Sequence, residues 1–189
     1  MRIRRTALGI VVAAAVVGAL AGCVQPSPTV IPTSVPSAKP VFASDADALA
    51  AAKKAYVAYL AVSDEILIDG GANANRLLKV ATAAELKKQM PGFDAAQSKH
   101  WRSTGATQID SITLQRVDET APHGEGIVTV YACVDVSKVD VIDSSGSSVV
   151  SSTRPTASTF EATFNLVSRD PVRLILSDEE PWQGVGICP

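Results

Sequence analysis

The chain has 189 residues, of which 17 are Lys or Arg and 19 are Asp or Glu, giving a formal net charge of −2 at pH 7. Arg2, Arg4 and Arg5 lie in the first five positions, and from Cys23 onward 14 basic residues face 19 acidic ones, a net charge of −5. No basic run remains there, which argues against recognition of nucleic acid or anionic lipid by a folded part. The length is enough for one domain with a tether.

The first residues have the pattern of an export signal. Three positive charges precede an apolar run from Ala7 to Ala21 that contains no charged residue. A membrane span needs roughly 20 apolar residues, whereas this run is shorter and rich in Ala and Gly. We therefore expect a cleaved signal peptide over residues 1–22.

Leu-Ala-Gly-Cys at residues 20–23 resembles the bacterial lipobox, the cleavage site of lipoprotein precursors. The resemblance implies that signal peptidase cuts before Cys23 and that the Cys23 thiol carries a diacylglyceryl group, with acyl chains such as palmitate. Two or three acyl chains anchor a protein stably, whereas one holds only marginally. We expect a lipoprotein on the outer face of a Gram-positive cytoplasmic membrane.

Residues 23–42 read as the lipidated cysteine followed by a tether. Pro26, Pro28, Pro32, Pro36 and Pro40 alternate there with small polar residues. Such a segment favours extended polyproline conformations and has too few apolar residues to fold. A single globular domain is then expected over residues 43–189.

The domain is predicted to begin with helices. Ser44 has the position of a helix cap, and apolar residues recur at helical spacing until about Ile68, before glycines at 70 and 71. The sequence Thr-Ala-Ala-Glu at residues 82–85 matches a capping box, which predicts a short helix that Pro91 and Gly92 close. A further helical segment is expected over residues 93–102.

From residue 107 onward the pattern changes to period two, which predicts antiparallel strands. They are expected over residues 107–117, 126–136, 139–143, 147–152, 156–167 and 172–177. Alternate residues 128–136 and 160–166 each form an apolar strand face, and Ser144–Gly146 has the composition of a hairpin turn. Helices followed by an antiparallel meander predict an α+β fold.

This order of elements, with Tyr-Ala-Cys-Val-Asp at residues 131–135 and a terminal cysteine after Glu-Glu-Pro-Trp at 179–182, resembles the NTF2-like family. Small actinobacterial lipoproteins are similar in this respect. The resemblance covers residues 44–188 and implies helices packed on a curved antiparallel sheet that forms a cone. Another α+β antiparallel arrangement, cystatin-like for example, and a jelly roll are the alternatives.

Two cysteines remain if Cys23 is lipidated. Cys133 lies in an apolar strand-like run and Cys188 is the penultimate residue. An even pair in an oxidising location predicts a disulfide, and two free buried thiols are the alternative. Neither cysteine has a His or Cys at metal-ligand spacing or a histidine placed to activate it, so we expect no metal site, no cofactor and no catalytic thiol.

NTF2-like cones often enclose a pocket, and four residues are candidates for its lining. Tyr56 and Tyr59 lie on the first predicted helix, Trp101 ends the helical region, and Asp135 lies in a strand. An inward Asp135 would be a buried carboxylate suited to act as a base, whereas alternation with the valines favours an outward, solvated one. No catalytic residue of enzymatic relatives matches a motif here.

We therefore expect a non-catalytic domain of the cell envelope that binds a small apolar ligand or a protein. One alternative is a pocket enzyme of the isomerase or dehydratase type, with Asp135 or Asp110 as base. Another is an assembly module of a secretion or conjugation apparatus. Two carboxyls and a tyrosine converging in an apolar pocket would favour the enzyme, whereas a filled or shallow cone would favour binding to a partner.

Overall fold

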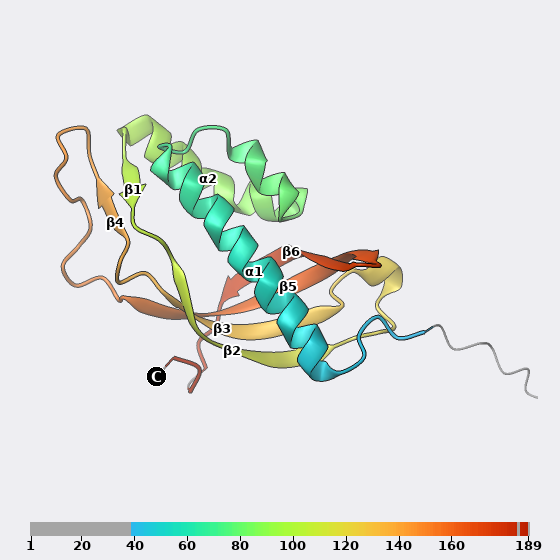
Figure 1. Cartoon of the computed structure of the whole chain (residues 1–189). Helices are drawn as coiled ribbons and strands as arrows, with labels where there is room; N and C mark the ends of the chain where they lie inside the picture. Colours follow the sequence, from blue (N-terminus) through green and yellow to red (C-terminus); the bar gives the residue numbers. More distant parts are fainter. Residues whose placement is uncertain (1–38, 185, 189) are drawn as a thin grey trace, which may run out of the picture. The chain divides into compact units, whose positions relative to one another are not determined.

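The computed structural model describes residues 39–184 and 186–188 (Figure 1). The predicted signal peptide, Cys23 and residues 24–38 of the predicted tether lie outside these residues. Ala38–Pro189 forms one compact unit, and the hydrophobic core is assembled within it. Among the helices of the part of the chain that is described, none is long and apolar enough to cross a membrane.

The first helix, α1, covers Asp45–Ile68, as the sequence predicts. The Ser44 side chain accepts a hydrogen bond from the Asp47 N–H at 3.2 Å, which satisfies one of the free donors of the first turn. At the other end, Gly71 has a φ of 82° and donates its N–H to the Ile66 carbonyl. A Cβ on Gly71 would collide with the Phe93 carbonyl, so this position requires glycine.

The second helix, α2, runs without a break over Ala83–Lys99, so the prediction that Pro91 and Gly92 close it is wrong. Both residues are exposed, while Leu86 and Phe93 on either side of them are buried in the core. Core packing before and after the proline keeps the helix continuous, because the lost hydrogen bond falls where water can replace it. A short 3-10 helix not predicted from the sequence, η1 (Ala74–Lys79), connects α1 to α2.

Four antiparallel strands form the main sheet in the order β2–β3–β5–β6. Their bounds are Gln108–Val117, Val128–Asp135, Ala157–Arg169 and Val172–Pro181. Figure 1 shows α1 crossing one face of this sheet, called here the inner face, with α2 beside it. The α+β class with helices packed on an antiparallel sheet is thereby confirmed, and the sheet is not closed into a barrel. The NTF2-like relationship stays a prediction.

The inner face carries the predicted apolar rows. Val128, Val130 and Ala132 are fully buried, and so are Ala162 and Phe164 of β5, which pair with β3 in antiparallel register. Phe42 is only 7% exposed and joins the same core, while the Val41 and Phe42 N–H groups donate to the Glu119 carboxylate. The folded part therefore begins a few residues before the predicted boundary at 43.

Two short strands form a separate antiparallel pair, β1 (Arg102–Thr104) with β4 (Asp140–Ile142). The helical segment predicted to reach Arg102 ends at Lys99 instead, because His100 adopts a left-handed conformation with a φ of 54°. The strand predicted over residues 147–152 is wrong. This exposed stretch contributes only an isolated bridge between Ile142 and Ser148, since it has no core to pack against.

Candidate functional site

The four candidate pocket residues do not share one pocket. Tyr56 and Tyr59 lie together on the core side of α1, 0% and 2% exposed. Asp135 ends β3 on the outer face of the sheet, opposite the buried valines. Trp101 lies beyond the last turn of α2, in the connection to β1. Folding therefore joins the two tyrosines and separates them from the other two residues.

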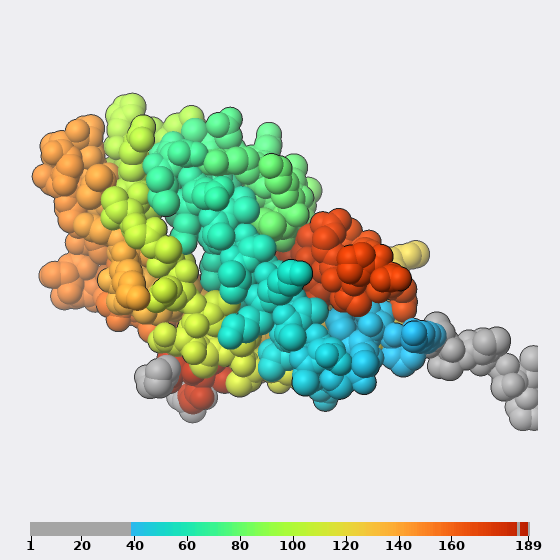
Figure 2. Space-filling view, in the orientation of Figure 1, coloured from blue at the N-terminus to red at the C-terminus, as the bar shows by residue number. Residues whose placement is uncertain are grey.

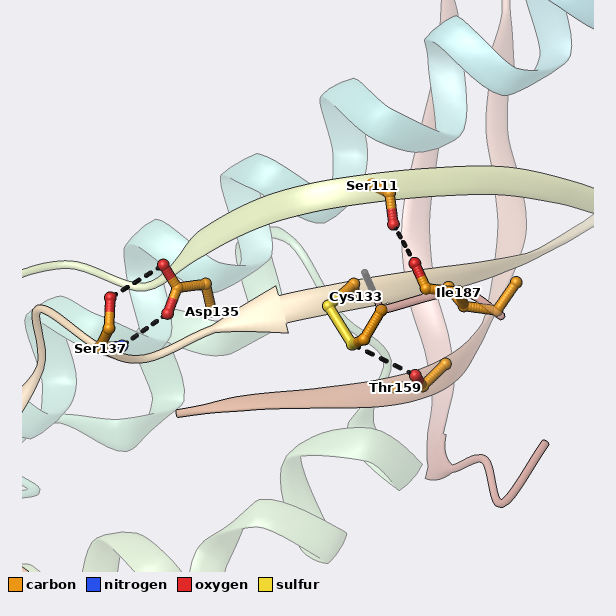
Figure 3. The surroundings of a disulfide bond; sticks show 7 residues. Ser111, Cys133, Asp135, Ser137, Thr159 and Ile187 are labelled. Carbon is orange, nitrogen blue, oxygen red and sulfur yellow. Dashed lines mark hydrogen bonds between the residues drawn. A yellow bond between two sulfur atoms is a disulfide. The ribbon is translucent and has the colours of Figure 1, made fainter. Parts of the chain in front are cut away.

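Asp135, the last residue of β3, faces outward, as its alternation with the valines predicts. Its carboxylate accepts the Ser137 N–H at 2.7 Å and the Ser137 hydroxyl at 2.9 Å (Figure 3). The backbone hydrogen bond from Ser137, followed by the hydroxyl bond, lowers the pKa of Asp135 below its usual value. A carboxylate held in this way is a poor base and serves to fix the turn after β3.

Trp101 lines a surface cavity of about 540 Å³ between the end of α2 and the loop after β4. His100 and Arg102 line the same cavity, and the Lys99 ammonium lies 4.2 Å from the centroid of the Trp101 ring. Because the cation already occupies the aromatic ring, this arrangement stabilises the helix end and leaves less of the ring for a ligand.

Tyr56 and Tyr59 converge on two carboxyl groups that the sequence analysis did not single out. The Tyr56 hydroxyl donates to Glu179 Oε1 at 2.5 Å, and the Tyr59 hydroxyl lies 3.4 Å from both Glu179 Oε2 and Glu85 Oε1. The two phenol rings are stacked with centroids 6.0 Å apart. These four side chains, called here the carboxyl–tyrosine cluster, join α1, α2 and β6.

Burial dominates the electrostatics of the cluster. It raises the pKa of Tyr56 and of Tyr59 far above the ordinary tyrosine value, and the charge of Glu179 raises them further. Burial also raises the pKa of Glu179, although the hydrogen bond from Tyr56 acts in the opposite direction. The cluster thus holds both phenols protonated and makes the Glu179 carboxyl harder to ionise than an exposed glutamate.

Glu85 reaches the core because the predicted capping box is only half formed. Thr82 Oγ1 accepts the Glu85 N–H at 3.2 Å, as the motif requires. The Thr82 N–H, which the Glu85 side chain would normally bond, instead donates to the Leu176 carbonyl of β6 at 2.9 Å. The Glu85 side chain is therefore released from the cap and is fully buried, with Gln89 donating to its Oε1 at 2.7 Å.

Lys88 lies at the solvent side of the cluster. Its ammonium donates to Asp178 at 2.5 Å and to Glu180 at 2.8 Å, and it lies 3.5 Å from Glu85 Oε2. That last distance is an ion-pair contact without hydrogen-bond geometry, since Glu85 Oε2 has no hydrogen-bond partner. Burial by itself would lower the pKa of Lys88, but its hydrogen bonds to Asp178 and Glu180 outweigh burial and raise it.

A groove lies between α1, the end of η1 and the start of β6, with a volume of about 260 Å³. Figure 2 shows these three segments meeting on the face turned to the reader, in teal, green and red. The lining is apolar apart from three cations and consists of Ala51, Lys54, Ala55, Ala58, Lys79, Val80, Pro171, Val172, Arg173 and Leu174. None of the four cluster side chains lines it.

The walls of the groove are fixed by backbone hydrogen bonds. The Leu176 N–H donates to the Val80 carbonyl, and the Thr82 N–H donates to the Leu176 carbonyl, each at 2.9 Å. These bonds hold the connection between η1 and α2 against β6. On the facing wall, alanines on α1 are too small to reach across. The groove is therefore a formed feature of the fold, as small-molecule sites usually are.

The C-terminal segment crosses the outer face of the sheet (Figure 3). A disulfide joins Cys133 to Cys188, the predicted pair, with Cα atoms 4.9 Å apart. Ser111 of β2 donates to the Ile187 carbonyl at 2.5 Å, and Thr159 of β5 donates to Cys188 Sγ at 3.4 Å. Three strands thus hold the segment, and it buries the Cys133 side chain completely.

Residues 39–184 and 186–188 contain no group of three His, Cys, Asp or Glu side chains placed to hold a metal ion. No protein-family model matches the chain, and no curated protein matches it. A de novo designed β-sheet protein, solved in solution by NMR, is similar with a TM-score of 0.32 and 14% sequence identity, over 76% of this chain and 94% of its own.

Proposed function

We propose that this protein is a lipid-anchored, non-catalytic binding domain of the cell envelope that takes a small apolar ligand. The observation that carries the binding proposal is the groove between α1, η1 and β6, which is about 260 Å³ in volume and apolar apart from three cations, with one wall fixed by backbone hydrogen bonds. This volume lies just below the usual range for small-molecule sites, which suits a small ligand or a single alkyl chain.

The carboxyl–tyrosine cluster is the feature that speaks for the alternative of a pocket enzyme, because two carboxyls and two tyrosines converge there. The hydroxyls of Tyr56 and Tyr59 are, however, already directed at Glu179 and Glu85. Hydrogen bonds among these buried groups fix the packing of the elements that carry them, although Glu85 Oε2 has no hydrogen-bond partner among the described residues. The cluster is therefore best understood as a link between α1, α2 and β6, and the groove as the binding site.

Filling the groove tests the binding proposal. Ala58→Leu places a larger side chain in the groove, and we expect it to weaken binding of N-phenyl-1-naphthylamine, an uncharged apolar fluorophore, by about tenfold or more in a fluorescence titration. Ala84→Leu, at an exposed position of α2 outside the groove, is the matched control and should leave binding unchanged. Equal binding by all three proteins, or binding by none, would refute a groove for apolar ligands.

The lipid anchor is tested separately from the groove. The full chain, expressed in a Gram-positive host, should fractionate with the membrane and carry acyl chains on Cys23 in mass spectra, as the lipobox of residues 20–23 implies. Cys23→Ala should carry none. A wild-type Cys23 without acyl chains would contradict the anchor. The fluorophore titration would still test ligand binding in the groove independently.

A further inference from the structure

The groove is bordered by three cations that come from three separate elements. Lys54 lies on α1, Lys79 is the last residue of η1, and Arg173 lies at the start of β6. All three are exposed side chains. They are far apart in sequence, so no basic run in the sequence indicates that folding brings them to one groove.

These three cations are not engaged by other described residues. Arg76, Lys88 and Arg116 form the ion pairs found within residues 39–184 and 186–188, whereas Lys54, Lys79 and Arg173 take part in no ion pair and no side-chain hydrogen bond there. A cation that no described side chain engages keeps its capacity to bind an anion.

The charge around the groove is opposite to that of the domain. No Asp or Glu lines the groove, although the chain from Cys23 onward has a net charge of −5. The acid nearest in sequence, Asp170, precedes the lining residue Pro171 and is not part of the lining. An apolar floor edged by cations on an acidic domain is complementary to a ligand that has an apolar body and an anionic head.

We infer that the groove binds a single-chain amphiphile whose phosphate head group is held by Lys54, Lys79 and Arg173. This inference rests on the proposed function and names the ligand class of the same groove. A guanidinium fork matches two phosphate oxygens and two ammonium groups serve as point charges, so three cations suit a phosphate with its three acceptor oxygens. The alkyl chain lies on the alanines of α1, opposite Val172 and Leu174.

One end of the groove lies beside the first described residues. The Arg169 guanidinium donates to the Lys39 carbonyl at 3.2 Å, so the first described residue lies beside the β5–β6 turn. Two residues further along, Pro171 begins the lining of the groove. The lip of the groove is therefore next to the point at which the chain enters the folded domain.

The test compares amphiphiles that share one chain. Because the core lies within residues 38–189, the test uses this part of the chain with its disulfide oxidised. It is titrated with decyl phosphate, decyl maltoside and inorganic phosphate, each amphiphile below its micelle-forming concentration. The binding signal is the change in NMR chemical shift of the Ala55, Ala58 and Leu174 amides. We expect decyl phosphate to bind at least about tenfold more tightly than uncharged decyl maltoside, and far more tightly than inorganic phosphate.

A charge-matched pair of double variants locates the head group. Lys54→Gln with Arg173→Gln should weaken decyl phosphate binding by about tenfold or more and leave decyl maltoside unaffected. Lys53→Gln with Lys87→Gln removes the same charge at exposed positions outside the groove and should change neither affinity. All substituted residues are exposed, and circular dichroism checks that each variant is folded.

Each other outcome overturns the inference in a recognisable way. Equal affinity for decyl phosphate and decyl maltoside would refute recognition of an anionic head group, while the proposed function, an apolar binding groove, would still stand. Inorganic phosphate binding as tightly as decyl phosphate would show that the alkyl chain contributes nothing to binding. Equal losses in both double variants would mean attraction to net charge only, and no shift of the groove amides with any amphiphile would refute the groove itself.

Discussion

Glu179 shows how burial changes the chemistry of a single residue. In the sequence it is one of two adjacent glutamates before Pro181, with nothing to distinguish it from Glu180. In the fold Glu179 turns toward Tyr56 and Tyr59, while Glu180 pairs with Lys88 at the exposed edge of β6. Strand alternation predicts opposite sides for neighbouring residues, but the hydroxyls that meet Glu179 come from a helix more than a hundred positions away.

The raised pKa of Glu179 predicts a pH-dependent effect of Glu179→Gln. Below the ordinary glutamate value of 4.5 the carboxyl is protonated in both the folded and unfolded chain. As the pH rises above 4.5 the unfolded carboxyl ionises first, so wild-type stability contributed by this residue declines. The free energy of unfolding of Glu179→Gln, measured by urea denaturation, should therefore rise relative to wild type between pH 4.5 and neutrality.

Glu125→Gln makes the same substitution at an exposed position and serves as the control for this comparison. A relative stability of Glu179→Gln that falls as the pH rises would mean that the folded state favours the ionised carboxylate. The two tyrosines would then act mainly as donors to a charge, and burial would be the weaker influence.

At the scale of elements, periodicity predicted which faces are buried better than it predicted where the elements end. The valine row of β3 and the apolar row of β5 pack inward as their alternation indicates. Pro91 and Gly92 were expected to end a helix, and they do not, because the apolar residues around them bury against the core. Local propensity is weak compared with the packing of whole faces.

Substitutions at the two helix-breaking residues test the continuity of α2. Gly92 is exposed, and a Cβ built there meets nothing within 4 Å, so Gly92→Ala should raise the free energy of unfolding by about 0.5–1 kcal/mol. Pro91→Ala restores a backbone hydrogen-bond donor in the helix and should stabilise the protein by more, up to about 3 kcal/mol. Part of this gain is offset because the unfolded chain becomes more flexible without the proline. Urea denaturation midpoints measure both.

Gly146→Ala is the matched contrast for these variants. A Cβ there also meets nothing within 4 Å, but Gly146 has a φ of 83°, which an alanine adopts at a cost of about 1–2 kcal/mol. It should destabilise the protein while Gly92→Ala stabilises it. A loss of stability in Gly92→Ala would show that α2 is interrupted at this point in solution.

At the scale of the whole molecule, the disulfide attaches the end of the chain to the middle of the sheet. It closes a sequence separation of 55 residues and holds the C-terminal segment over β2, β3 and β5. Trp182, at the start of this segment, packs on Tyr131 of β3 with ring centroids 4.5 Å apart. The cross-link therefore restricts the unfolded chain and also covers the outer face.

Cys188→Ser should lower the free energy of unfolding by about 2–4 kcal/mol, because the unfolded chain regains the freedom that the cross-link removes. Thermal unfolding measures the loss, and Trp182 fluorescence should change as the segment leaves Tyr131. Reduction of the wild-type protein is the second measurement and should give the same loss. Equal stability of the oxidised, reduced and substituted proteins would contradict a stabilising role for the bridge.

The sequence by itself determined the features that depend on neighbouring residues: the cap of α1, the buried strand faces and the α+β class. The lipid anchor on Cys23, which residues 20–23 imply, stays a prediction. The pairing of Cys133 with Cys188 followed from the cysteine count, because these two remain if Cys23 is lipidated. Only the tertiary structure decided that Tyr56 and Tyr59 meet Glu85 and Glu179, and that Lys54, Lys79 and Arg173 border one groove. Those sets come from elements distant in sequence, and packing, which no local pattern encodes, brings them together.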